Sequence, residues 1–235
     1  MSTFIAYISY PIILIAYLKA VKSFLLLIRT PEENRSISVS TTKNQTHIYT
    51  VTGILDVLFL GRLFRVNKPL WIGEWGFHIS FILVVLGHLR FIVHYPPGWF
   101  YHLVCIGKYA GILLTFSLIY ILFVRVSNRQ KPNYLSPRNL LLILHIFSLG
   151  ATGIILRFFI RTDIISVKEF VMGILSFHPV PLNSGGLFIL HFLLFLILLL
   201  YLPSHVLSAP FVIVEARKRE GNLKLLHYPE EGHDG

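Results

Sequence analysis

The chain has 235 residues, of which 54% are hydrophobic and only 14% are charged, and its mean hydropathy is +0.69. This composition is typical of integral membrane proteins and excludes a protein built mainly of soluble domains. The net charge of +10 is interpreted as a signal of membrane topology, and nothing in the sequence indicates a nucleic-acid partner.

Five apolar segments are each long enough to cross a bilayer, which requires roughly 20 residues. They cover about residues 4–28, 71–94, 103–125, 139–160 and 186–210. The first segment lacks the basic start and the small-residue cleavage site of a signal peptide, so we expect it to be retained. The sequence therefore predicts an all-α fold, an integral membrane five-helix bundle in which residues 1–235 form a single membrane domain.

Shorter segments between the spans are predicted to lie at the membrane surface or in water. Residues 30–47 are polar, whereas residues 48–66 are apolar with two arginines near their end and are typical of an interfacial helix. The apolar run VKEFVMGILSF is too short to span and is expected to lie along the outer surface as a half-helix. The charged tail 215–235 is predicted to be cytoplasmic, and either flexible or ordered by a partner.

Lysine and arginine gather in three of the segments that connect or follow the spans. These residues are Arg29, Arg35, Lys43, Arg62, Arg65 and Lys68, then Arg125, Arg129, Lys131 and Arg138, and finally Arg217, Lys218, Arg219 and Lys224. The link HYPPGW between the second and third spans has none. The positive-inside rule therefore predicts that the N-terminus lies outside and the C-terminus in the cytoplasm. The same charges can contact anionic membrane lipid.

Four histidines lie at matched depths in two of the predicted spans. His78 and His88 belong to WIGEWGFHISFILVVLGHLRFIV, and His191 and His205 belong to GLFILHFLLFLILLLYLPSHVLSAP. Each lies roughly 8–10 Å inside one end of its span, so His88 matches His191 near the outer surface and His78 matches His205 near the inner one. Histidine is costly inside a membrane, and axial imidazole is a common ligand of haem iron. The pattern predicts two bis-histidine haems, one above the other, which would conduct electrons across the bilayer.

Two further residues bear on the type and the ligands of these haems. Cys105 is the only cysteine, which excludes covalent attachment through CxxCH as well as a CxxC iron–sulfur or zinc site, so the predicted haems are non-covalent and of the b type. His145, in LLLILHIFSLGATG, lies at the depth of the inner pair. It is an alternative inner ligand, a candidate to bond a haem propionate, or a satisfied polar residue of the core. We expect His205, rather than His145, to be the inner ligand.

The residues around these histidines resemble a known family. The segments LFRVNKPLWIGEWGFHISFILVVLGHLRF, GATGIILRF and LHFLL…YLPSHVLSAP are similar to the gamma subunit of respiratory nitrate reductase, a di-haem cytochrome b. They look still more like the cytochrome b subunits of heterodisulfide-reductase-like and sulfite-reductase-linked membrane complexes. The resemblance covers essentially the whole chain. It departs in the last helix, where many relatives have the inner histidine about one turn later, near Ser208.

The resemblance implies a multi-pass protein of a prokaryotic inner (cytoplasmic) membrane that serves as the electron-transfer subunit of a respiratory oxidoreductase complex. It implies that quinol from the quinone pool is oxidised near the outer haem and that the electrons pass to a cytoplasmic iron–sulfur subunit. The conversion of the substrate is then expected on a partner subunit. Carried over by position, the two histidine pairs are the haem ligands. Lys108 then lies near the quinol site, and Arg157 pairs with haem propionates.

Other functions remain open at this point. His94, His102 and His178 are expected at the outer surface, where they are candidates to shuttle quinol protons or to dock a periplasmic cytochrome c, or are simply interfacial residues. A transporter that binds metal or relays protons through its histidines is one alternative, although the sequence contains no evident inverted repeat. A membrane anchor subunit without a cofactor is another.

Overall fold

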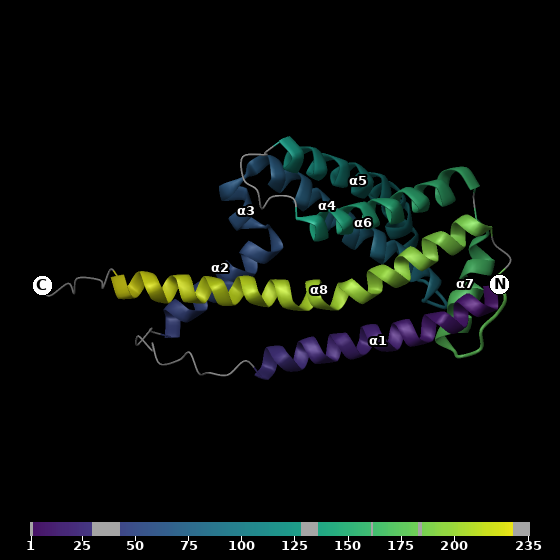
Figure 1. The fold of residues 1–235 in the computed structure, drawn as a ribbon, viewed down its shortest axis with the longest axis horizontal. Coiled ribbons are helices and arrows are strands. Elements are labelled where there is room, and N and C mark those ends of the chain that lie inside the picture. Colours follow the sequence, from purple (N-terminus) through teal and green to yellow (C-terminus); the bar gives the residue numbers. More distant parts are fainter. Residues whose placement is uncertain (1, 30–42, 128–135, 161, 183–184, 228–235) are drawn as a thin grey trace, which may run out of the picture. The chain divides into compact units, whose positions relative to one another are not determined.

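The computed structural model describes residues 2–29, 43–127, 136–160, 162–182 and 185–227, and all regular elements in these ranges are helices (Figure 1). Five of them are long and apolar enough to cross a membrane. These candidate spans are Thr3–Leu26, Lys68–Phe91, Phe100–Ser127, Pro137–Ile160 and Gly186–Pro203. The predicted all-helical fold with five candidate spans is therefore confirmed.

The chain divides into two compact units, which are described separately. The first contains Met1–Ile15 and Asn67–Leu200, and the second contains Ala16–Val66 and Tyr201–Gly235. Two long helices, α1 (Ser2–Arg29) and α8 (Gly186–His227), contribute residues to both units.

Three neighbouring helices form the centre of the first unit: α4 (Lys68–His88), α5 (Phe100–Ser127) and α6 (Pro137–Ile155) (Figure 1). Helix α5 packs against both α4 and α6. Both α4 and α6 begin where the sequence supplies a capping residue followed by proline. The Asn67 side chain accepts a hydrogen bond from the Leu70 amide, and the Ser136 hydroxyl accepts one from the Asn139 amide. A proline in the first turn costs no helical hydrogen bond, so both starts are locally specified.

Small residues on one face of α4 allow α5 to approach closely. A side chain at Gly73 would lie 2.8 Å from atoms of Tyr120 and Ile121, and one at Gly107 would lie 3.3 Å from the backbone of Gly87. Between these points, Ser80 is fully buried. Close backbone approach through small residues is the usual way in which helices associate in a membrane, where the hydrophobic effect between helices is absent.

The end of the first unit that carries His88 is closed by a short helix, α7 (Ile164–Leu175), and we call it the His88 end. The start of α7 is capped by Asp163, which accepts hydrogen bonds from the Ser166 hydroxyl and from the Ile165 and Ser166 amides. Its apolar side packs in a core with α1 and the start of α8. The members of this core are Ala6, Val167, Phe170, Ile174, Leu182 and Phe188.

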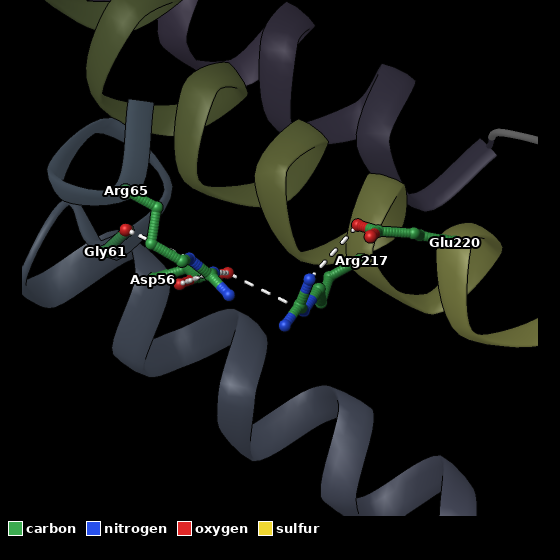
Figure 2. A network of polar contacts seen from close by, with 5 residues as sticks. All are labelled: Asp56, Gly61, Arg65, Arg217 and Glu220. Carbon is green, nitrogen blue, oxygen red and sulfur yellow. Dashed lines mark hydrogen bonds and ion pairs between the residues drawn. The ribbon is translucent and has the colours of Figure 1, made fainter. Parts of the chain in front are cut away.

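The second unit contains the helices α2 (Lys43–Leu58) and α3 (Gly61–Val66) and the C-terminal part of α8. Figure 2 shows the Asp56 carboxylate between two arginines, Arg65 of α3 at 3.0 Å and Arg217 of α8 at 3.6 Å. Arg217 also pairs with Glu220 at 3.1 Å. Two of the basic residues that the sequence assigned to the cytoplasmic surface are thus engaged within this unit.

Two elements differ from the sequence-based prediction. The helix expected over 48–66 is split at Phe59 and Leu60, and Leu60 has a φ of 49°, a left-handed conformation that ends α2. The last helix, expected to end near 210, continues through Pro203 and Pro210 to His227. The predicted half-helix over 167–177 is present as α7. Residues 30–42 and 228–235, which belong to the predicted loop and tail, lie outside the described residues.

Candidate functional site

His88 and His191 meet at the His88 end of the first unit. His88 is the last residue of α4, and His191 lies in the second turn of α8. Their ring centroids are 6.4 Å apart, and the ring planes are inclined by only 20°. As whole residues, His88 is exposed and His191 is partly buried.

Both rings are held through the same nitrogen, Nδ1. The Nδ1 of His88 lies 2.7 Å from the Val84 carbonyl oxygen, and the Nδ1 of His191 lies 2.9 Å from the hydroxyl of Thr152 on α6. A carbonyl oxygen can only accept, so His88 carries its proton on Nδ1. An Nδ1–H donor leaves Nε2 unprotonated in a neutral imidazole, and an unprotonated Nε2 is what a metal ligand needs.

The spacing of the two rings fits a single iron between them. A metal–imidazole nitrogen bond is about 2 Å long, and the ring centroid lies about 1 Å beyond that nitrogen, so two opposed ligands of one ion have centroids about 6 Å apart. The observed 6.4 Å agrees with that separation. No group of three or more His, Cys, Asp or Glu residues suited to a metal ion occurs among the described residues. Haem iron can be held by two histidines, and His88 and His191 would be the residues that hold it here.

Helix α6 lies directly against the His191 ring. A side chain at Gly153 would lie 3.1 Å from the Cε1 atom of His191, which explains why glycine is suited to this position. The preceding residue, Thr152, is buried and also bonds the carbonyls of Ser148 and Leu149. The Thr152 hydroxyl can therefore donate its proton to a carbonyl oxygen of its own helix and at the same time accept a hydrogen bond from the Nδ1–H of His191.

The second predicted pair lies outside what the structure describes, because its two histidines belong to different units and the side chain of His205 is not described. The Nδ1 of His78 lies 2.6 Å from the Glu74 carbonyl oxygen, which leaves its Nε2 available in the same way as that of His88. His205 lies in the part of α8 that belongs to the second unit, and its side chain is outside the described residues. One turn before His78, the Glu74 carboxylate pairs with Arg125 of α5 at 2.7 Å.

His145 is bonded through its other nitrogen. Its Nε2 lies 3.0 Å from the carbonyl oxygen of Leu194, so this ring donates across from α6 to α8. The arrangement satisfies a polar side chain in an apolar region and connects the two helices. In this geometry, the nitrogen that would bind iron is already occupied by a proton.

Three cationic residues lie around the His88 end. Lys108 of α5 places its ammonium 4.9 Å from the centroid of the Phe158 ring, and Phe158 belongs to η3 (Leu156–Ile160), a π-helical turn that follows α6. Arg157 precedes Phe158 in the same turn. Arg90 lies in η2 (Leu89–Phe91), the 3₁₀ turn that follows α4, and its guanidinium carbon lies 4.5 Å from the centroid of the Phe91 ring. π-Helical turns are often found at functional sites.

The remaining candidates lie at the surface of this end. His94, His102 and His178 are exposed. The backbone oxygen of His94 accepts a hydrogen bond from Lys168 of α7, and the Nδ1 of His178 lies 2.8 Å from the Ser176 oxygen. None of these three rings contacts the His88–His191 pair in the described structure. Cys105 is exposed on α5 as a free cysteine.

Thr152 and Arg90 are site residues that were not singled out from the sequence. The available signal for Thr152 was a hydroxyl residue inside an apolar span, one position before Gly153. The signal for Arg90 was a charge two residues after a span histidine. Neither signal indicates which helix the side chain faces. Matching the depths of residues along the spans therefore could not identify Thr152 or Arg90 as site residues.

Comparison with known proteins supports a cytochrome b-like reading. The chain is 24% identical over 152 residues to an Hdr-like menaquinol oxidoreductase cytochrome b-like subunit from Archaeoglobus profundus, with 58% of this chain and 45% of that protein covered. It is 26% identical over 149 residues to a protein of the same description from Archaeoglobus fulgidus, with 57% and 45% covered. The chain thus spans somewhat less than half the length of the curated relatives it matches.

No family model matches the chain, and no solved structure matches it. The chain is thus a helical protein with five candidate membrane spans and two adjacent histidine rings, and the two relatives that it resembles are described as cytochrome b-like subunits.

Proposed function

We propose that this chain is a membrane cytochrome b subunit that carries two non-covalent b-type haems and transfers electrons between the quinone pool and a cytoplasmic iron–sulfur partner. The observation that carries the proposal is the His88–His191 pair, with its 6.4 Å ring separation and both Nδ1 atoms engaged. The names of the two archaeal relatives, which describe a menaquinol oxidoreductase, support the same class. Haem, when bound, supplies one-electron redox chemistry between two fixed imidazoles.

The assignments of His78, His88, His145 and His191 rest on which ring nitrogen is free, and that of His205 rests on its position in the last span. His88 and His191 hold the outer haem. His78, whose Nε2 is available, is one ligand of the inner haem. His205 is the second inner ligand, and His145 serves to connect α6 with α8 through its bond to Leu194.

Lys108 contributes to the quinol site near the outer haem. It follows Gly107, which lies against the residue before His88 at the tight crossing of α4 and α5. Its ammonium is held between the Tyr109 and Phe158 rings, at 5.3 and 4.9 Å from their centroids. A cation held by aromatic faces in an apolar region retains donors for a quinol oxygen.

The membrane is a prokaryotic inner membrane, with the N-terminus and the His88 end outside and the C-terminus in the cytoplasm. This orientation comes from the distribution of lysine and arginine. It places the quinol side outside and the inner haem near the partner. A periplasmic cytochrome c at the outer surface is a further candidate partner.

The test is the haem content of the purified full chain. A pyridine-haemochrome assay is expected to give two haems per polypeptide, and a dithionite-reduced-minus-oxidised spectrum is expected to show b-type bands. Replacing His88 or His191 by Ala should remove one haem and leave the other reducible. A wild-type protein without haem contradicts the proposal, and the transporter and the membrane anchor without a cofactor then become the candidate functions.

The inner assignment has its own test. The His205→Ala variant is expected to lose the inner haem, whereas His145→Ala is expected to keep it and to be less stable, because a helix-to-helix hydrogen bond is removed. Loss of the inner haem in the His145 variant alone would reverse the assignment.

Partner docking is tested by shortening the chain. Removing residues 215–235 should weaken retention of the iron–sulfur partner and leave both haems in place. Because that deletion also removes Arg217 from Asp56, Arg217→Gln is the matched variant that breaks this ion pair alone. Retention that is unchanged by the truncation contradicts the docking site.

A further inference from the structure

A charged pair lies inside the apolar part of the first unit. A carboxylate oxygen of Glu74 on α4 is 2.7 Å from a guanidinium nitrogen of Arg125 on α5, and the two side chains are only 16% and 18% exposed. Both residues belong to candidate membrane spans, Lys68–Phe91 and Phe100–Ser127. Ionisable side chains are costly within a membrane and usually mark a function, so this pair requires an explanation.

Stability alone does not explain the pair. Helices α4 and α5 already approach closely at Gly73, where an added side chain would lie 2.8 Å from atoms of Tyr120 and Ile121. A buried ion pair contributes little net stability, because the cost of removing two charges from water offsets most of their attraction. Arg125 is two residues from the end of α5 and is long enough to reach water, yet it pairs with Glu74, and its Nε atom is buried without a hydrogen-bond partner.

The position of the pair along α4 indicates what it acts on. Glu74 and His78 are four residues apart, so their side chains lie on the same face of the helix, with Cβ atoms about 6 Å apart. The Glu74 carbonyl oxygen also accepts the Nδ1–H of His78, at 2.6 Å. His78 is the residue that we assign to the inner haem. A charge on Glu74 therefore acts at close range on a group bound to His78, in a region where screening by water is weak.

We propose that the Glu74–Arg125 pair sets the redox potential of the haem held by His78. The inference rests on the proposed function and deepens it. Reduction adds one electron at this site, so a nearby negative charge disfavours reduction and a nearby positive charge favours it. The carboxylate of Glu74 lowers the potential, and the guanidinium of Arg125 limits that effect. Neither residue is a ligand, and both act through their charge.

The test is a redox titration of the full chain with its haems, followed at the b-type absorption bands. Glu74→Gln keeps the size of the side chain and leaves Arg125 charged. It should raise the midpoint potential of the inner haem by at least about 59 mV, which is a tenfold change in a one-electron equilibrium. Glu74→Gln combined with Arg125→Gln removes both charges and should return the potential close to that of wild type. Arg125→Lys keeps the positive charge and should leave the potential near wild type.

Two controls accompany these variants. Arg138→Gln removes an exposed charge at the start of α6 and should not shift the potential of the inner haem, because water and salt screen an exposed charge. The outer haem, identified as the one that His88→Ala removes, is the internal control. It should keep its potential in every variant, because His88 is ten residues, or about 15 Å of helix rise, beyond His78.

The outcomes separate this inference from the proposed function. If His78→Ala removes no haem, the inner site of the proposed function is overturned. If His78→Ala removes one haem but Glu74→Gln leaves the potential of that haem unchanged, the inner site is kept and the electrostatic role is overturned. An equal shift in Glu74→Gln and in the double variant, or a common shift of both haems, shows that the pair acts only on the structure and also overturns the inference.

Discussion

The hydroxyl of Thr152 offers the sharpest test of how the outer site is built. It lies 2.9 Å from the Nδ1 atom of His191 and bonds the carbonyls of Ser148 and Leu149 at 2.9 and 3.0 Å. Thr152→Val keeps the shape and removes the hydroxyl. The Nδ1–H of His191 then has no acceptor, and the ring is free to change its tautomer.

The expected size of the effect can be worked out in two ways. Leaving a buried donor unsatisfied costs about 1–3 kcal/mol. Loss of the residue that orients a metal-bound histidine typically lowers metal affinity about 10–100-fold, which corresponds to about 1.4–2.8 kcal/mol. The two estimates agree, so Thr152→Val should accelerate loss of the outer haem to excess apomyoglobin by about 10–100-fold. A less basic His191 should also raise the midpoint potential of this haem.

Thr115→Val is the matched control for this experiment. Thr115 is buried to the same extent as Thr152, with 8% of its surface exposed, and also bonds the carbonyl four residues earlier, at 3.0 Å. It has no histidine partner among the described contacts. Both variants should lose a similar small amount of stability, but only Thr152→Val should release haem. If the two variants retain haem equally, the bond to His191 has no part in ligation and the reasoning fails.

Three other predictions concern the framework. Gly107→Ala would place a methyl group 3.2 Å from the Leu83 oxygen. It should lower the thermal stability of the protein in detergent by an amount corresponding to about 1–3 kcal/mol. Gly98→Ala is the control and should be neutral, because a methyl group at Gly98 would have nothing within 4 Å. Glu74→Gln leaves Arg125 unpaired and should cost about 2–3 kcal/mol, since both side chains of this pair are mostly buried; an unchanged melting temperature would contradict this. The hydrogen bond from the Ser166 hydroxyl, and to a smaller extent those from the Ile165 and Ser166 amides, lowers the pKa of the Asp163 carboxyl. The carboxylate therefore stabilises α7 above its unfolded pKa of about 3.9, and this stabilisation is lost as pH falls through the folded pKa. Hydrogen exchange at the start of α7 should rise in acid, and Asp163→Asn should abolish that pH dependence.

The spans could be predicted from the sequence because they depend only on length and apolar composition. The spans were predicted to begin at about residues 71 and 139, whereas α4 and α6 begin at Lys68 and Pro137, where Asn67 and Ser136 act as local capping residues that need no tertiary contact. The orientation of the bundle is likewise a sequence-based prediction, because it comes from charge alone.

Helix ends were less predictable. The last span was predicted to end near residue 210, yet α8 continues through Pro203 and Pro210 to His227. A proline removes one backbone hydrogen bond and can be accommodated within a helix, so it is a weaker stop signal than a capping residue.

The break between α2 and α3 depends on a contact with Asp56, and the hydrophobic periodicity of the sequence does not predict this contact. Any side chain at Gly61 would lie 2.6 Å from the Asp56 carboxylate oxygen, so glycine allows the chain to turn close to this residue after the left-handed Leu60. The turn brings Arg65 within 3.0 Å of Asp56. The hydrophobic pattern over 48–66 predicts a helix but carries no information about this ion pair.

Within the candidate site, depth matching singled out His88 and His191, whose rings the structure places side by side. Depth cannot distinguish a histidine that offers Nε2 from one that has already used it. His78 and His88 each use Nδ1 toward the carbonyl four residues earlier, which is a property of their own helix and rotamer. His145 uses Nε2 toward a different helix, which depends on how α6 packs against α8. The ring nitrogen that is left free, rather than the position of the histidine along its span, is therefore the physical basis on which we assign ligation to the first two and a structural role to the third.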